Sequence, residues 1–242
     1  MAKTDKNESA KERKAASQTR RQELEHHLRT SPTDLDGFME LAAIYRSENR
    51  PQEAKRILQQ AKKIFPEDEK VAWEYEEAVL ARSLQQLREV TDLDNRLSTA
   101  ETERELQRSM TDWASRRIEV CRARLGRDPS LHHFRIVMAE AMADADMHEK
   151  AISILEPLTK IDDYSSHAYL IKGRCQLAVN KDVEAMASLR AASIRRAVNA
   201  PPKVKIAALR LLCDTAERLG VELTLNRYRE ILKQTERQLQ QS

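Results

Sequence analysis

Glycine and proline are scarce in this sequence, with 4 glycines and 7 prolines among 242 residues. Dinucleotide-binding folds need glycine-rich phosphate loops, and strand-rich folds need turn residues every ~8–12 positions. Aromatic residues contribute only 4% of the chain, whereas strands are enriched in aromatic and β-branched side chains. These shortages exclude both classes of fold and predict an all-α protein.

Cysteines and long apolar runs are also few. The three cysteines, Cys121, Cys175 and Cys213, are far apart in the sequence. Their spacing excludes a CxxC zinc site and a disulfide framework, so we expect buried free thiols in a reducing compartment. The sequence contains no run of about 18 apolar residues, so it predicts no membrane span. The polar stretch from Met1 to Arg21 is not a signal peptide, and the expected localisation is cytoplasmic.

Charge of either sign is abundant but balanced. The chain has 42 basic and 39 acidic residues and a net charge of +3, which does not by itself require a nucleic-acid partner. One basic cluster stands out, and it could contact phosphates, a membrane surface or an acidic segment. It lacks the interleaved aromatic residues that stack on bases, so nucleic acid is disfavoured and a charged repeat edge is the simpler interpretation. The candidate basic patch comprises Arg190, Arg195, Arg196, Lys203 and Lys205.

A pattern of large and small residues runs through residues 35–68. Two antiparallel helices approach closely only where side chains are small, and a proline ends a helix because it lacks an N–H. Numbered from Leu35, the pattern occupies positions 4, 7, 8, 11, 20, 24, 27 and 32. These positions hold Phe38, Leu41, Ala42, Tyr45, Ala54, Leu58, Ala61 and Pro66.

All eight positions agree in type with the tetratricopeptide repeat (TPR), so this segment resembles that family. The resemblance implies a superhelix of antiparallel helix hairpins with a concave groove. Pro32 lies 34 residues before Pro66 and closes a preceding helix over 16–30, which we expect to cap the array through Leu24 and Leu28. Residues 1–15 are expected to form a disordered basic and polar tail.

The 34-residue period returns in the second half of the chain. Predicted helices over 132–145 and 149–160 are followed 34 residues later by a similar pair, so that Ala151 and Ala185 keep their spacing. Gly173 takes a small packing position. The resemblance covers about two thirds of the chain and implies a cap plus first repeat at 16–68, two repeats at 129–200, and a terminal or capping hairpin at 201–242 that Gly220 divides.

The regular spacing breaks between these regions. Ala54 and Ala151 are 97 residues apart, which is not a multiple of 34, and residues 67–125 contain no glycine or proline. Residues 69–128 are rich in helix formers, and leucines spaced by three and four predict a coiled-coil-like helix or helix pair that bends within Thr91–Thr102.

Two interpretations of this insertion stay open. It folds back on the array as an irregular repeat, because Trp73, Tyr75, Trp113 and Ile118 need a local core. Alternatively, it projects as an arm and forms a homodimer through residues 80–120, which would make the protein a dimeric adaptor.

The sequence contains no motif for catalysis. It has no nucleophile elbow, phosphate-binding loop or HExxH zinc motif. The adjacent pairs His26–His27 and His132–His133 point about 100° apart on a helix, so they cannot chelate a metal as residues four apart do. We therefore expect a non-enzymatic protein with no catalytic, cofactor-binding or metal-binding residues.

The TPR resemblance implies a binding surface instead. In that family the first helix of each repeat lines the groove, mainly through positions 2, 5, 9, 12 and 13. The corresponding residues here mix apolar and charged side chains, which suits a peptide or helix of a partner protein. The Lys and Asn that clamp chaperone C-termini are missing, which disfavours a co-chaperone. The candidate groove residues are Met39, Arg46, His133, Ile136, Glu140, His167, Leu170, Arg174, Arg210 and Asp214.

Overall fold

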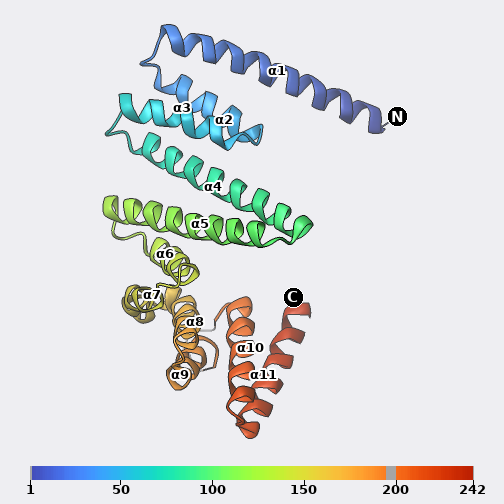
Figure 1. Cartoon of the computed structure of the whole chain (residues 1–242), viewed down its shortest axis with the longest axis vertical. Coiled ribbons are helices and arrows are strands. Elements are labelled where there is room, and N and C mark those ends of the chain that lie inside the picture. Colours follow the sequence, from blue (N-terminus) through green and yellow to red (C-terminus); the bar gives the residue numbers. More distant parts are fainter. Residues whose placement is uncertain (1, 195–199, 242) are drawn as a thin grey trace. The chain divides into compact units, whose positions relative to one another are not determined.

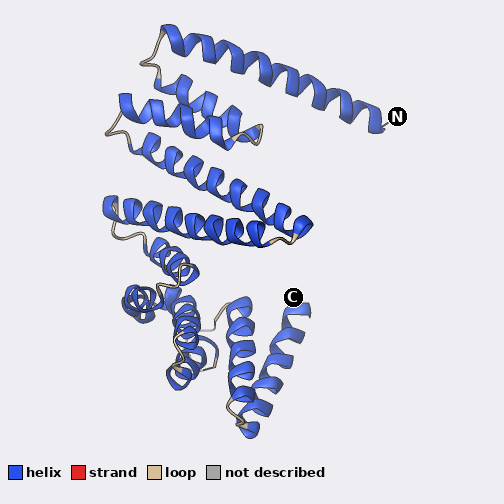
Figure 2. Cartoon of the chain, viewed as in Figure 1, coloured by secondary structure: helices blue, strands red, loops and turns tan. Residues whose placement is uncertain are grey.

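The structure, a computed structural model, describes residues 2–194 and 200–241, with side chains over 16–194 and 200–240. All regular secondary structure in these residues is helical (Figures 1 and 2), which confirms the predicted all-α class. No described helix combines the length and the apolar character that a membrane crossing needs. The chain divides into two compact units, Met1–Arg116 and Arg117–Ser242, which we describe separately.

The first unit packs its helices in chain order, α1 on α2, α2 on α3, and α3 on α4. Residues 2–15 continue α1, whereas the sequence predicts a disordered tail over 1–15. Helix formers such as Ala, Lys, Glu and Arg dominate this stretch and it lacks glycine and proline, which accounts for the helix. The helices are α1 (Ala2–Thr30), α2 (Leu35–Ser47), α3 (Pro51–Ile64), α4 (Glu69–Leu97) and α5 (Ala100–Arg127), the last of which crosses the unit boundary.

The core of the first unit consists of the residues that carry the 34-residue pattern. Four of these residues are fully buried: Leu41, Ala54, Leu58 and Ala61. Phe38, Ala42 and Tyr45 are buried in the same cluster, together with Leu24 and Leu28 of α1 and Val71 and Ala78 of α4. Leu24 and Leu28 of α1 therefore share one core with the residues of the 34-residue pattern.

The same four-residue connector precedes α2, α4 and α6. Each connector has a proline at its second position, Pro32, Pro66 or Pro129. In each, the backbone N–H of the fourth residue donates to the carbonyl of the first, over 3.3, 3.3 and 3.4 Å. The pair α4–α5 is thus bounded on both sides by the connectors that bound the short hairpins.

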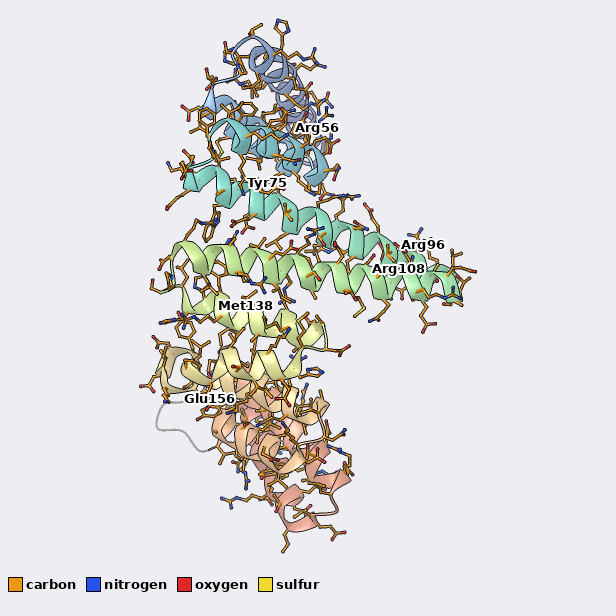
Figure 3. The ribbon with its side chains drawn as sticks, turned by 60° about the vertical axis from the view of Figure 1, so that its left-hand side comes forward. Arg56, Tyr75, Arg96, Arg108, Met138 and Glu156 are labelled. Atoms are coloured by element: carbon orange, nitrogen blue, oxygen red, sulfur yellow. The ribbon has the colours of Figure 1, made fainter. Side chains whose placement is uncertain are left out.

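The segment 69–128 forms a long antiparallel hairpin. Helices α4 and α5 hold 29 and 28 residues, against 13 and 14 in α2 and α3, so each is about four turns longer. The chain reverses at Ser98, a left-handed residue with φ 47°, inside the stretch predicted to bend. In Figure 3, Tyr75 marks the part of α4 near α3, and Arg96 and Arg108 mark the distal end of the hairpin.

The second unit continues with helix pairs in chain order. A 3-10 turn replaces the end of the predicted helix 149–160, because Pro157 cannot donate to an α-helical ladder. Its core falls into two clusters, one around Ala151, Leu155 and Leu158 and one around Leu189, Leu209 and Leu212. The helices are α6 (His132–Asp144), α7 (His148–Leu155), η1 (Glu156–Lys160), α8 (Asp162–Ala178), α9 (Asp182–Ser193), α10 (Pro202–Arg218) and α11 (Glu222–Gln241).

One turn type closes all four short hairpins. A left-handed residue sits at its centre, and the next backbone N–H donates to the carbonyl five residues earlier, over 2.8–3.0 Å. This is the Schellman arrangement that ends many helices. The central residues are Asn49, Asp146, Asn180 and Gly220, with φ between 55° and 68°. Only Gly220 was identified from the sequence.

Candidate functional site

The candidate groove residues of the second unit lie on α6, α8 and α10. These three helices are the first members of their hairpins, and α8 packs against both α6 and α10. Small buried residues allow the close approach of the pairs, as at Gly173, where an added Cβ would lie 2.7 Å from Cγ of Leu189 on α9. The groove positions of α6, α8 and α10 therefore belong to neighbouring helices of one compact unit.

Charged side chains on this face differ in how firmly they are held. Arg117 at the α5 end of the unit pairs with Asp144 over 2.8 Å and with Glu140 over 3.6 Å. Arg210 pairs with Glu236 of α11 over 2.8 Å. Arg174 is exposed and forms no ion pair with another described residue, so its guanidinium is available to an acidic group of a partner.

Ile136 is largely buried. Its side chain is only 9% exposed and lies in the cluster that contains Ile118 and Cys121 of α5. This cluster includes residues of α5, whereas the repeat numbering considers only the hairpin in which Ile136 lies. Only a small part of the Ile136 side chain is accessible, and its contact with a partner stays a prediction. Leu170 also packs against the core, although part of it stays accessible.

The other candidate residues have varied surroundings. His133 is exposed, with its ring centroid 4.0 Å from that of Phe134, Asp214 is exposed, and His167 is half-buried. Met39 and Arg46 lie on α2 and belong to the first unit. Met39 packs against the core of that unit, and Arg46 pairs with Glu74 of α4 over 2.5 Å.

The candidate basic patch is described only in part. Arg195 and Arg196 lie outside the described residues. Lys203 is exposed and Lys205 is half-buried near the start of α10. Arg190 donates its Nε–H to the carbonyl of Met186 over 3.1 Å and borders a pocket of about 340 Å³ beside Tyr228.

The first unit also contains a basic pocket that the sequence pattern does not predict. It measures about 310 Å³ and lies where α3, α4 and α5 meet. Ser83 and Arg116 hold the carboxylate of its only acidic lining residue, Asp112, over 3.0 and 3.4 Å. Because the residues come from three helices, no local motif marks the site. The pocket is lined by Gln52, Lys55, Val79, Arg82, Ser83, Gln86, Asp112 and Arg116.

A further pocket, of about 300 Å³, lies between α1, α2 and α3. The Tyr45 hydroxyl donates to Glu25 over 2.7 Å at its edge. Burial, followed by this carboxylate, raises the pKa of Tyr45 to about 12. The phenol therefore keeps its proton at neutral pH and joins α2 to α1.

The three cysteines are free and buried, as the sequence predicts. Burial raises the pKa of the Cys175 and Cys213 thiols, which lowers the fraction of reactive thiolate. Over the part of the chain that the structure describes, no group of three or more His, Cys, Asp or Glu side chains is arranged to hold a metal ion.

Comparison with models of known protein families finds no match to the chain, and comparison with curated proteins finds none either.

Proposed function

We propose that this chain is a TPR-like helical-repeat protein that binds a peptide or helix of a partner protein on the face formed by α6, α8 and α10. In this proposal the protein serves as a scaffold or interaction module and not as a catalyst. The second unit would supply the binding face, and the regular hairpins would hold that face rigid.

One observation carries the proposal. The first helices of successive hairpins contact one another, α6 with α8 and α8 with α10, while the described residues of α7 and α9 share no comparable helix contact. Helices that lie closest together line the inner side of a curved array, and such arrays bind extended segments along that side.

The chemistry of this face favours an acidic or mixed segment with an apolar anchor. Arg174 offers a cation near the middle of the face, the accessible part of Leu170 offers apolar contact, and Asp214 on α10 offers a carboxylate. A buried central contact surrounded by charged residues is the usual composition of a binding site for a protein segment.

Charge reversal on this face tests the proposal. The full-length protein and its Arg174→Glu variant would be used to capture partners from the source cell extract, with quantification of each co-purified protein by mass spectrometry. Lys150→Glu is the matched control, since Lys150 is an exposed cation on α7, a second helix. We expect at least one protein to be lost about tenfold with Arg174→Glu, as removal of a charged contact costs more than ~1.4 kcal/mol, and to be retained by Lys150→Glu.

Two results would contradict the proposal. A set of captured proteins that Arg174→Glu leaves unchanged would show that the first-helix face is not the binding surface. Equal losses with both variants would show a general effect of net charge. Unchanged helicity by circular dichroism would establish that the variants are folded.

A further inference from the structure

The basic pocket of the first unit takes one face from each of three helices. Residues three and four apart share a face of a helix, and this spacing relates the lining residues within each helix. The lining residues are Gln52 and Lys55 of α3, Val79, Arg82, Ser83 and Gln86 of α4, and Asp112 and Arg116 of α5. Seven of the eight carry a polar group, so the pocket suits a polar ligand.

Positive charge exceeds negative charge in this pocket. Lys55, Arg82 and Arg116 face one carboxylate, that of Asp112, which leaves two positive charges without a match in the lining. The pocket between α1, α2 and α3 differs, because two arginines there are matched by two glutamates. An excess of cations in a concave site raises the local concentration of anions.

The carboxylate of Asp112 is engaged by its own neighbours. The buried Ser83 hydroxyl donates to its Oδ2 over 3.0 Å, and Nε of Arg116 lies 3.4 Å from its Oδ1. Because each carboxylate oxygen has a partner, Asp112 balances the charge of Arg116 on α5. The charges that α3 and α4 contribute are left for a ligand.

These two cations have donors to spare. Lys55 is half-buried and forms no hydrogen bond or ion pair with another described residue. Arg82 uses only its Nη1, which lies 3.5 Å from Oε1 of Gln85 and 3.8 Å from a carboxylate oxygen of the exposed Glu89; long, exposed pairs of this kind contribute little. The Nε and Nη2 groups of Arg82 stay available, and a guanidinium presents such donors as a fork that matches two oxygens of a phosphate.

We infer that the basic pocket binds a phosphate dianion, either free or as the head of a small phosphate ester. A phosphate ester carries about −1.5 to −2 charges at neutral pH, which balances the two unmatched cations of the lining. The side-chain amides of Gln52 and Gln86 have N–H groups that can donate to further oxygens. This inference does not depend on the proposed binding role of α6, α8 and α10, because every lining residue belongs to the first unit.

The size and polarity of the pocket limit the ligand. Its volume of about 310 Å³ is at the lower end of the range for small-molecule sites. Val79 supplies the apolar part of the lining, and the described lining holds no aromatic side chain on which a nucleotide base would stack. The pocket therefore favours a small ester such as glycerol phosphate over a nucleotide.

Isothermal titration calorimetry of the full chain tests this inference. Glycerol phosphate and inorganic phosphate are titrated at neutral pH and constant ionic strength, with acetate as a singly charged comparison. We expect a dissociation constant below about 1 mM for the tighter phosphate probe, and binding of acetate at least about tenfold weaker. Tighter binding of glycerol phosphate would identify an ester as the ligand, and tighter binding of inorganic phosphate would identify the free ion.

Variants that remove one charge test whether the phosphate lies in this pocket. Lys55→Gln and Arg82→Gln should each raise the dissociation constant at least about tenfold, because each removes a charge-assisted hydrogen bond to phosphate. The matched controls are Lys63→Gln on α3 and Arg88→Gln on α4, since both residues are exposed on the same helices and do not line the pocket. They remove the same charge and should bind like the wild type, within about twofold, because solvent screens exposed charges.

Three results would overturn the inference. One is the absence of saturable binding of both phosphate probes up to about 10 mM. Another is binding of acetate as tight as that of phosphate, which would show a general attraction of anions. The third is an equal loss in the pocket variants and their controls, which would place the binding outside the pocket. Circular dichroism identifies the variants that remain folded, so that each loss of binding is measured on folded protein.

Discussion

The short hairpin α2–α3 and the long hairpin α4–α5 share one plan but differ in what holds their helices together. In α2–α3, Leu41, Leu58 and Ala61 are fully buried between the helices, and their burial supplies hydrophobic stabilisation. In the distal part of α4–α5, Thr102 and Asp94 share a hydrogen bond instead. A hairpin can therefore be lengthened by whole turns without extending its apolar core. The added distal part then gains little stability from burial.

The two units carry separate intrinsic probes for such comparisons. Both tryptophans, Trp73 and Trp113, lie in the first unit, and all three cysteines lie in the second. Tryptophan fluorescence in urea therefore follows unfolding of the first unit. Alkylation of the thiols, which react slowly while buried, follows unfolding of the second.

The largest difference is expected between apolar positions of the two hairpins. Leu58→Ala removes a fully buried side chain of α3 and should lower the free energy of unfolding by about 3 kcal/mol, through lost burial and the cavity left behind. Leu97→Ala at the distal end, where the side chain is 56% exposed, should cost less than about 0.5 kcal/mol in the monomer. Tryptophan fluorescence at low protein concentration measures both, and equal losses would refute the contrast.

A smaller effect is expected where two short-hairpin helices touch. Gly173→Ala would place a Cβ 2.7 Å from Cγ of Leu189, so we expect a net loss of about 1 to 2 kcal/mol from overpacking. Gly126→Ala on α5, where a Cβ would meet nothing within 4 Å, should gain up to about 1 kcal/mol from helix propensity. Thiol alkylation in urea measures both variants. Adding Leu189→Ala should make the two losses less than additive; strict additivity would contradict direct contact.

The short hairpins could be predicted from sequence better than the long one, for physical reasons. The alternation of Phe38, Leu41 and Ala42 reflects packing between helices next to each other in the chain, so local spacing is enough to find it. In α4–α5 both helices grow by a similar length, and no glycine or proline marks the reversal at Ser98. The 34-residue repeat numbering is therefore interrupted at the residues that form this hairpin in the structure.

Contacts from outside a hairpin were also beyond the sequence. Ile136 lies in one core cluster with Ile118 and Cys121 of α5, and nothing in its own repeat predicts that cluster. The basic pocket combines Lys55, Arg82 and Arg116 from three helices. The hairpin turns share no sequence signature, because Asn, Asp and Gly all adopt the left-handed conformation. The backbone conformation therefore repeats although the residue type does not.

The polar interior of the long hairpin can be divided into parts that stabilise it and parts that do not. Thr102→Val removes the bond to Asp94 and the bond that the Thr99 backbone N–H donates to the Thr102 hydroxyl, and should cost about 1 kcal/mol. Ser109→Ala should be neutral or slightly stabilising, because the buried Ser109 hydroxyl has no hydrogen-bond partner among the described residues. Hydrogen exchange of the α5 amides measures the local effect. A loss with Ser109→Ala as large as that with Thr102→Val would mean that close packing, and not hydrogen bonding, holds the helices together.

The smallest effect is expected at the reversal itself, where the two kinds of hairpin use different residues. Gly220 meets the left-handed requirement in α10–α11 without a Cβ, whereas Ser98 adopts φ 47° in α4–α5 with one. Left-handed backbone costs an L-residue about 1–2 kcal/mol, part of which glycine gives back through greater freedom in the unfolded chain. Ser98→Gly should therefore slow hydrogen exchange at the hairpin tip by a net gain of about 0.5 kcal/mol, while Ser98→Ala, which keeps the Cβ, should not. Equal protection in both variants would show that the tip is ordered by the Asp94–Thr102 bond alone and that the turn adds nothing to it.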